Sequence, residues 1–177
     1  MAVTPVAVLV GPPGAGKSTV GRQLAQQLRV AAHDTDAAIE ASAGRSISDI
    51  ITTDGEATFR ELEEQAVATA IAEQHGVVAL GGGAVLSATT RARLAGHTVV
   101  FLNVGMAEGV RRSGLSAARP LLAGVNPRST FKLLLDARLP LYREVAVVEV
   151  ATDGRAIADV VAEVLTALQT TPRGAQP

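Results

Sequence analysis

The residues with the clearest chemical potential in this 177-residue chain are Gly-Pro-Pro-Gly-Ala-Gly-Lys-Ser at positions 11–18. They match the phosphate-binding loop G-x-x-x-x-G-K-[ST], in which backbone N–H groups surround the phosphates of a nucleotide. The lysine reaches the β- and γ-phosphates and the serine hydroxyl binds Mg²⁺. A glycine-rich turn that matches by chance is the alternative, but an apolar run before it and an amphipathic run after it argue against chance. The residues expected around the phosphates are Gly14, Ala15, Gly16, Lys17, Ser18 and Thr19.

Two carboxylates, Asp34 and Asp36, follow the second apolar run of the chain. If the backbone is still extended there, both side chains point the same way, because side chains alternate along a strand with period two. Beside a phosphate loop, such a pair suits a ligand for metal-bound water and an acceptor for a substrate hydroxyl. A helix N-cap is the alternative for either residue, and the residues alone leave open which of the two is the base.

Two further patterns could recognise a ligand. Arg60 and Glu63 are three residues apart and share a helix face, where an ordinary exposed ion pair is the alternative. The glycines Gly81, Gly82 and Gly83 follow the third apolar run directly. Three glycines give up side-chain contacts and permit close backbone approach to a ligand, although a tight turn is the alternative. Their position at the end of an expected strand favours ligand binding.

Arginines cluster in the last third of the chain. A guanidinium group binds phosphates and carboxylates through paired hydrogen bonds, so this cluster suits an anionic ligand. Pro120 favours an extended backbone at Arg119, whereas we interpret Arg111 and Arg143 as solvated surface residues. The cluster comprises Arg111, Arg112, Arg119, Arg138 and Arg143.

The composition predicts a globular protein with a small-molecule partner. Hydrophobic residues make up 47% of the chain and charged residues 19%, which is unlike a disordered chain. A net charge of −1 argues against a nucleic-acid partner. No uninterrupted apolar run is long enough to predict a membrane span. The chain has no cysteine, which fits the reducing environment of the cytoplasm.

Alternating strands and helices must position these residues. Such alternation predicts an α/β fold, in which a parallel sheet is covered by helices on both faces and ligands lie at the carboxyl ends of the strands. The five apolar runs that predict strands are residues 6–10, 30–33, 77–80, 98–102 and 146–150. Helical periodicity covers residues 17–28, 35–43, 54–74, 89–95, 107–113, 129–139 and 156–168.

The chain length predicts one domain over residues 1–169, followed by a disordered tail at 170–177. The stretch from Gly114 to Pro127 interrupts the strand–helix alternation with glycines, prolines and small residues. A loop of this length usually forms a lid or a disordered segment. We therefore expect a lid at about residues 113–127.

Together these motifs closely resemble those of the shikimate kinases. The resemblance runs from about residue 6 to residue 168, and its motifs follow the order of that family. The phosphate loop alone occurs in many families, but the other motifs at these spacings are specific. They are Asp34-Thr35-Asp36, Phe59-Arg60-x-x-Glu63, Gly81-Gly82-Gly83, Arg119-Pro120-Leu121-Leu122, and Arg138 followed by Tyr142.

The resemblance implies a fold and a reaction. The fold is a three-layer α/β/α arrangement with a five-stranded parallel sheet in the order 2-3-1-4-5, a phosphate loop and a lid. The reaction transfers the γ-phosphoryl group of ATP, with Mg²⁺, to the 3-hydroxyl of shikimate, giving shikimate 3-phosphate and ADP on the chorismate route to aromatic amino acids. We expect a cytoplasmic monomer that binds neither nucleic acid nor membrane.

The resemblance also implies roles for individual residues at the reaction centre. Lys17 contacts the transferring phosphoryl group, and Arg119 reaches the phosphates from the lid. Ser18 binds Mg²⁺ directly, and Asp34 binds it through water. Asp36 takes the shikimate hydroxyl.

The remaining implied roles concern the rest of the two ligands. Arg60 and Arg138 hold the shikimate carboxylate, with Glu63 and the backbone of residues 81–83 alongside. The implied adenine contacts are Arg112 and Arg155.

The residues leave two other functions as alternatives. Another small-molecule kinase of this fold, acting on gluconate or a nucleotide, is the nearer one, although a base-binding site would need more aromatic or amide groups. A nucleotide-driven switch is the other, but the chain lacks the N-K-x-D motif for guanine. ADP release with shikimate, compared with other hydroxy acids and nucleosides, would distinguish these functions.

Overall fold

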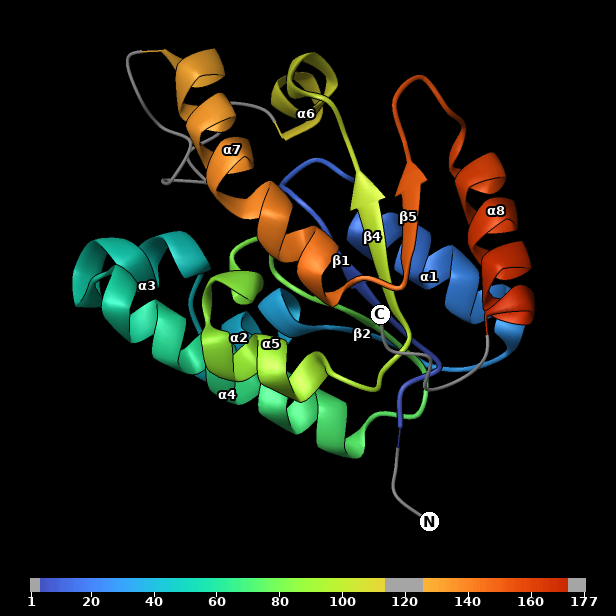
Figure 1. The fold of residues 1–177 in the computed structure, drawn as a ribbon. Coiled ribbons are helices and arrows are strands. Elements are labelled where there is room, and N and C mark those ends of the chain that lie inside the picture. The colour runs from blue at the N-terminus through green and yellow to red at the C-terminus, as the bar shows by residue number, and fades with distance from the viewer. Residues whose placement is uncertain (1–3, 114–125, 172–177) are drawn as a thin grey trace.

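The computed structural model describes residues 4–113 and 126–171 (Figure 1). Its sheet is entirely parallel, in the order β2-β3-β1-β4-β5. This confirms the predicted fold class and strand order. Residues 114–125 of the expected lid, Arg119 among them, and residues 172–177 of the expected tail lie outside the described residues. The strands are β1 (Ala7–Val10), β2 (Ala32–Asp34), β3 (Val77–Ala79), β4 (Val99–Asn103) and β5 (Val148–Ala151).

Helices cover both faces of the sheet. Helices α1 and α8 pack on one face, α4, α5 and α7 pack on the other, and α2 and α3 lie against α4 (Figure 1). The helical elements are α1 (Lys17–Leu28), α2 (Thr35–Ala43), α3 (Ile47–Asp54), α4 (Glu56–Glu73), the 3-10 turn η1 (Ala84–Leu86), α5 (Ala88–Leu94), α6 (Met106–Ser113), α7 (Pro127–Val145) and α8 (Ile157–Thr170).

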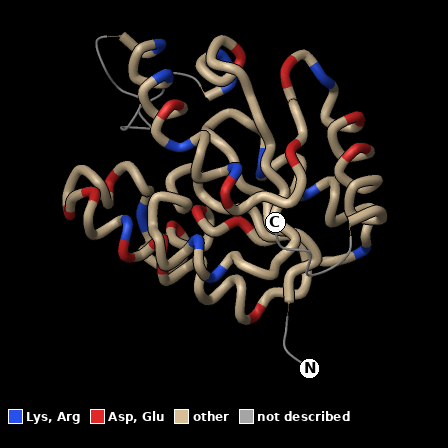
Figure 2. The backbone as a smooth tube through the Cα atoms, viewed as in Figure 1, with Lys and Arg blue, Asp and Glu red and all other residues tan. Residues whose placement is uncertain are grey.

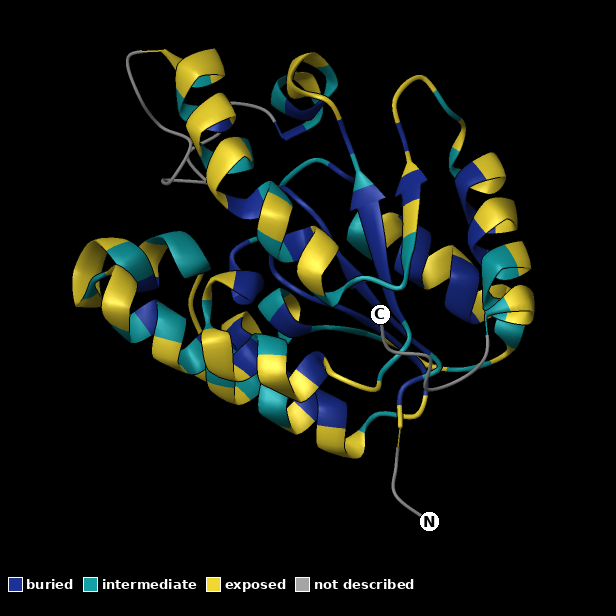
Figure 3. Cartoon of the chain, viewed as in Figure 1, coloured by how far each residue is buried: buried dark blue, intermediate teal, exposed yellow. Residues whose placement is uncertain are grey.

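The alternation of side chains along β1 divides the core into two layers. Leu9 faces α1 and α8, where it joins a cluster that includes Leu24 and Val164. Val8 and Val10 face the opposite layer beneath α4, α5 and α7. Figure 3 shows the sheet and the inner faces of the helices as the buried part of the molecule. Small aliphatic side chains therefore fill a core that has few aromatic groups.

Two helical regions differ from the sequence-based expectation. Helix α3 was not predicted; Ser46 caps it, accepting a hydrogen bond from the Asp49 N–H, and Gly55 separates it from α4. Helix α7 continues to Val145, beyond the expected end at residue 139. Pro140 removes one helical hydrogen bond, but Pro140 and the residue four positions earlier, Asp136, are both exposed, so water can bind the freed carbonyl.

Charged residues lie mainly on the helices and loops around the sheet (Figure 2). Strands β1, β3 and β4 contain none. Within residues 4–113 and 126–171, no helix has the length and apolar character needed to cross a membrane.

Candidate functional site

The predicted site residues converge at one edge of the sheet, because parallel strands end side by side there. Strand β1 leads into the phosphate loop, β2 ends at Asp34, and β3 leads into the glycine turn at residues 81–83. A cavity of about 360 Å³ opens at this edge. It is lined by Gly14, Gly16, Lys17, Ser18, Thr19, Asp34, Asp36, Leu80, Gly82, Arg112 and Ile157.

The phosphate loop has the backbone that its glycines allow. Gly14 and Gly16 have φ angles of +80° and +89°, a region that other residues rarely adopt. Gly14 also packs closely on α6, since a Cβ atom there would lie 2.8 Å from the Gly109 carbonyl oxygen. The Lys17 ammonium folds over the loop and donates to the carbonyl oxygens of Gly11 at 2.8 Å and Pro12 at 3.0 Å. The loop and the amino end of α1 thus present a positive surface to the cavity.

The two aspartates lie at the start of α2. Asp34 is the N-cap, and its Oδ1 accepts from the backbone N–H groups of Asp36 at 2.9 Å and Ala37 at 3.2 Å. Its Oδ2 accepts a short hydrogen bond from the Ser18 hydroxyl. The capping alternative is therefore correct for Asp34, but it leaves the second carboxylate oxygen facing the phosphate loop. Asp36 lines the cavity from the first turn of α2.

These groups fit a hard divalent cation, because the Ser18 hydroxyl and the Asp34 carboxylate bring two oxygen ligands into contact. Over the parts of the chain that the structure describes, no group of three or more His, Cys, Asp or Glu residues could hold a metal ion. A cation at Ser18 would therefore need oxygen ligands from a bound nucleotide or from water.

A buried charge cluster lies beside the cavity, where α4 and α7 approach the glycine turn. Glu63 is 3% exposed and accepts from Arg60 Nη1 at 2.7 Å. Arg138, which is 7% exposed, also acts on this carboxylate. Burial nevertheless raises the pKa of Glu63, outweighing the two arginines. Two guanidinium groups beside one buried carboxylate form a setting that an anionic ligand would balance.

The glycine turn brings the cluster and the cavity together. The Gly81 N–H donates to Thr35 Oγ1 at 3.2 Å. A Cβ atom on Gly81 would lie 2.5 Å from Asp36 Oδ1 and 2.6 Å from Glu63 Oε1. One on Gly82 would lie 3.1 Å from the Pro13 ring of the phosphate loop. The turn needs glycine because functional groups crowd it from several sides.

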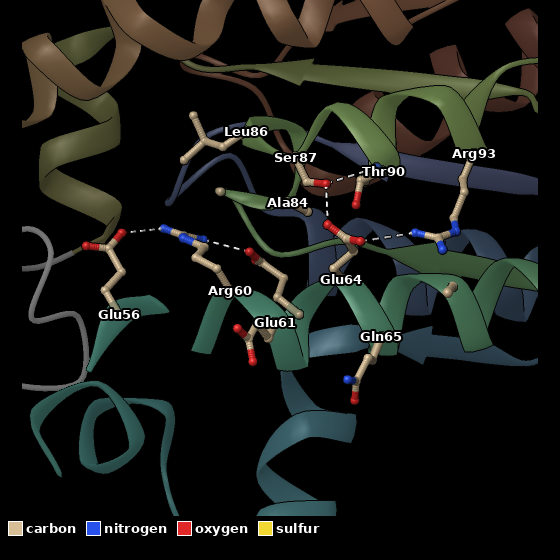
Figure 4. Close-up of a pocket in the computed structure, with 13 residues that line it drawn as sticks. Glu56, Arg60, Glu61, Glu64, Gln65, Ala84, Leu86, Ser87, Thr90 and Arg93 are labelled. Carbon is tan, nitrogen blue, oxygen red and sulfur yellow. Dashed lines mark hydrogen bonds and ion pairs between the residues drawn. The ribbon is translucent and has the colours of Figure 1, made fainter. Parts of the chain in front are cut away.

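Arg60 also borders a groove of about 580 Å³ between α4 and the η1–α5 segment (Figure 4). Glu56 lies at one end and pairs with Arg60 Nη2 at 3.2 Å. At the other end, Glu64 accepts from Ser87 at 2.6 Å and pairs with Arg93 at 3.6 Å. Gly83 packs against the Arg60 guanidinium. Arg60 is thus held from both sides on the helix surface, unlike an ordinary exposed ion pair.

Of the two residues expected at the adenine, only Arg112 lines the cavity in the structure. Arg112 lines the cavity; it pairs with Glu108 at 2.7 Å, and its Nη2 donates to the Thr152 carbonyl at 2.8 Å. Arg155 is not among the cavity-lining residues; it donates to the Ala151 carbonyl at 2.9 Å and pairs with Glu163 at 2.6 Å.

The two arginines interpreted as surface residues are indeed paired at the surface. Arg111 pairs with Glu108 at 2.5 Å and is well exposed. Arg143 pairs with Glu149 at 3.0 Å and is also exposed.

Sequence reasoning assigned no role to three residues that support this site. Thr152 and Glu108 fix Arg112. Glu108 lies four residues before Arg112 on α6, a spacing that indicates an ion pair, whereas Thr152 is forty residues away and no local pattern marks it. Tyr142 donates its hydroxyl hydrogen to the Gly82 carbonyl at 2.5 Å. For Tyr142 a signal was available, since it lies four residues after Arg138 and thus on the same helix face.

Comparison with known proteins gives one consistent result. The family model for shikimate kinase matches residues 13–169. The shikimate kinase of Saccharopolyspora erythraea is 66% identical over 152 residues, which cover 86% of this chain and 87% of that protein. A solved structure of shikimate kinase from Acinetobacter baumannii in complex with shikimate has a TM-score of 0.91 and 36% identity, covering 95% of this chain and 94% of that one. A gluconokinase from Sinorhizobium meliloti, at 21% identity and a TM-score of 0.55 over 96% of this chain and 94% of that one, shares the fold alone.

Proposed function

The chain belongs to the shikimate kinase family, so it is an ATP-dependent kinase of shikimate, and we propose that the cavity and the buried charge cluster divide this reaction between them. The cavity takes the nucleotide phosphates, and the charge cluster takes the carboxylate of shikimate. The glycine turn lies between the two and holds the shikimate ring near Asp36. The observation that carries this assignment is the Arg60–Glu63–Arg138 cluster, in which Glu63 and Arg138 are buried and Arg60 is partly exposed, within reach of the phosphate loop through a single turn.

The nucleotide half rests on the phosphate loop. Phosphoryl transfer passes through a loose, highly charged transition state, so catalysis depends on positioning and fixed positive charge. Residues 14–19 hold the phosphates through their N–H groups, and the Lys17 ammonium moves from its carbonyl partners to the transferring group. Arg112 contacts the adenine from its position on α6, and the same role is proposed for Arg155. Arg119 reaches the phosphates from the lid.

Ser18 and Asp34 would hold Mg²⁺, Ser18 through its hydroxyl and Asp34 through a bound water. When bound, the ion neutralises charge on the phosphate oxygens. The contact between the Ser18 hydroxyl and the Asp34 carboxylate supports this pairing, and the capping bonds fix Asp34 in place.

The substrate half rests on electrostatic balance. Glu63 is the one buried carboxylate beside Arg60 and Arg138, whereas Glu56, the other partner of Arg60, is half-exposed. A substrate carboxylate could pair with both guanidinium groups, which bind carboxylates bidentately. In the transfer step, the 3-hydroxyl oxygen of shikimate forms a bond to the γ-phosphorus as the bond to the bridging oxygen of ADP breaks. Asp36 accepts the hydroxyl proton.

The remaining proposals concern the cellular compartment, the type of partner and the oligomeric state of the enzyme. A cysteine-free chain suits the reducing cytoplasm. A net charge of −1 suits a small-molecule partner better than a nucleic acid. We propose a monomer, because the proposed site draws all its residues from one chain.

The experiment that tests this function is an assay of ADP release with shikimate, compared with a panel of other hydroxy acids and nucleosides. Arg138→Ala should raise the KM for shikimate about 30-fold or more, because an unpaired buried charge costs about 2–5 kcal/mol. Arg143→Ala, on the same helix but at the surface, is the matched control and should stay within about twofold of wild type. Equal damage by both variants, or turnover of another panel member in preference to shikimate, would contradict the proposal.

A further inference from the structure

Tyr142 is a fully buried aromatic residue between the sheet and the proposed shikimate site. It lies on α7 one turn after Arg138, and its side chain is 0% exposed. Its ring stacks on Phe101 of β4, with ring centroids 5.1 Å apart and planes inclined by 22°. The ring is therefore fixed by the core, and its hydroxyl group points to the glycine turn.

The hydroxyl of Tyr142 joins two parts of the site. It donates to the carbonyl oxygen of Gly82 at 2.5 Å. The guanidinium of Arg138 lies close enough to act electrostatically on the same hydroxyl group, where it favours the ionised form. A phenol oxygen can accept as well as donate, so a guanidinium beside it is compatible with the bond to Gly82. One O–H group thus connects the turn after β3 to the arginine on α7.

The Tyr142 hydroxyl group keeps its proton at neutral pH, so it can always donate to the Gly82 carbonyl. Burial raises the pKa of Tyr142 to about 12, although Arg138 opposes the shift. The phenol stays protonated at neutral pH, so its hydrogen always goes to the carbonyl. The direction of the bond from the Tyr142 hydroxyl to the Gly82 carbonyl is thereby fixed.

The glycine turn needs such a constraint. Glycine has wide backbone freedom, and three in succession hold their conformation only when neighbours impose it. The N–H of Gly81 is held by Thr35, and Gly82 packs on Pro13 of the phosphate loop. The Gly82 carbonyl is the group that Tyr142 holds. A shift of this turn would change the distances from Asp36 and Glu63, which crowd Gly81.

We propose that Tyr142 is a positioning residue for shikimate, which sets the glycine turn and the Arg138 guanidinium at a fixed separation through its single hydroxyl group. This inference rests on the proposed function, because it takes the turn and Arg138 as two walls of the shikimate site. Tyr142 itself need not touch the substrate.

The first test is Tyr142→Phe in the full chain, which removes only the hydroxyl. The KM for shikimate should rise about fivefold or more, while the KM for ATP stays within about twofold, since the phosphate loop is held by other contacts. One control separates this effect from general destabilisation. Thr90→Val removes a buried hydroxyl that has no hydrogen-bond partner within the described ranges. This variant should leave the shikimate KM within about twofold.

An unchanged shikimate KM in Tyr142→Phe, or equal rises for shikimate and ATP, would overturn the inference. A second measurement decides the matter even if that variant does not fold. Tyr142 is the only tyrosine of the chain, so biosynthetic labelling with 3-fluorotyrosine gives one ¹⁹F signal at this position. Saturating shikimate should shift that signal and ADP alone should not. A signal that shikimate leaves unmoved would also overturn it.

These outcomes are distinct from failure of the proposed function. If wild-type enzyme neither phosphorylates nor binds shikimate, the proposed function fails before any variant is made. If wild-type enzyme uses shikimate but the ¹⁹F signal and the shikimate KM are insensitive, only the role of Tyr142 fails.

Discussion

Lys17 is the residue whose substitution should reduce the rate most. Its ammonium is the fixed cation of the phosphate loop, and loss of such a cation in phosphoryl transfer costs several kcal/mol. Lys17→Met should therefore lower kcat by about a hundredfold or more while leaving the unfolding midpoint within a few degrees. Steady-state kinetics and thermal unfolding of the same preparation measure the two effects. Retention of more than about a tenth of the activity, a loss under about 1.4 kcal/mol, would contradict the proposed role.

The two aspartates should respond differently to substitution. Asp34→Asn should raise the Mg²⁺ concentration needed for half-maximal rate, because Asp34 is proposed to act through the ion. Asp36→Asn should lower kcat and weaken shikimate binding even at saturating Mg²⁺, since it removes the proposed proton acceptor. Titration of rate with Mg²⁺ at fixed ATP separates the two. Rescue of both variants by added Mg²⁺, or of neither, would show that the roles are not divided in this way.

Glu63 should make the stability of the protein depend on pH in an identifiable direction. Its pKa is raised in the folded chain by burial, so the folded state takes up this proton at a higher pH than the unfolded state does. The stability of wild type relative to Glu63→Gln should therefore increase as pH falls through the raised pKa towards the ordinary value of about 4.3, and then level off. Urea unfolding of both proteins at matched pH values measures the difference. If the difference in unfolding free energy between the two proteins stays constant with pH, or shrinks as the pH falls, the pKa of Glu63 is not raised in the folded protein.

At the same scale, the convergence of the candidate site residues could be predicted from the sequence better than the residues that support them. The closeness of Asp34 and Ser18 could be predicted because parallel strands end at the same edge of a sheet. Thr152 could not, because its bond to Arg112 joins residues forty positions apart through the meeting of β5 and α6. The burial of Glu63 could not be predicted either. The spacing of Arg60 and Glu63 shows that they share a helix face, but it does not show which elements cover that face.

At the scale of elements, helix α6 links the phosphate loop to helix α7. The Gly109 carbonyl lies against Gly14 of the loop, and the Gly109 α-carbon lies under the ring of Phe131 from α7. Arg138 is two turns further along the same α7 helix. The position of α6 is therefore set by α7, the helix that carries part of the proposed substrate site.

Gly109→Ala should reverse the usual effect of removing glycine from a helix. Alanine normally stabilises a helix interior by about 1 kcal/mol relative to glycine. Here its methyl group would overlap the Phe131 ring, and such overpacking costs about 1–3 kcal/mol. We expect a net loss of stability and a higher KM for ATP, measured by urea unfolding and kinetics.

The matched control is Gly21→Ala on α1. A Cβ atom there would lie 3.4 Å from Leu9 Cδ1, an ordinary packing distance. This variant should be neutral or more stable by up to about 1 kcal/mol. A Gly109→Ala protein as stable as the Gly21→Ala protein would mean that α6 and α7 move apart freely.

The ends of helices could be predicted where a glycine, a capping residue or a change in the spacing of apolar residues marked them. Helices α1 and α2 begin and end at the predicted residues, because the phosphate loop, Asp34 and Gly44 set their ends. Helix α3 was missed since only Gly55 separates it from α4. Helix α7 passes through Pro140, which local reasoning takes as a stop signal, because packing of α7 on the sheet outweighs one lost hydrogen bond.

At the scale of the whole molecule, the site is split between elements on the two faces of one sheet. The phosphate loop continues into α1 on one face, whereas Arg60 and Arg138 come from α4 and α7 on the other. Strand order places β1 beside β3, and the loop at Pro13 therefore meets the turn at Gly82. The regular alternation of strands and helices predicts a parallel sheet, but this order came from family resemblance. Local patterns cannot give it, because the pairing joins residues far apart in the chain.

This arrangement predicts that shikimate and ADP each stabilise the entire chain, as one cooperative unit. A ligand at 100 times its Kd adds about 2.7 kcal/mol to the free energy of unfolding. In a chain of this size each kcal/mol corresponds to about 2–4 °C, so each ligand should raise the Tm by about 5–10 °C. Calorimetry should show one transition that moves with either ligand and further with both. In Arg60→Ala the rise with shikimate should vanish and the rise with ADP should remain. Two transitions, with only one responding to shikimate, would mean that the halves of the site belong to separate folding units.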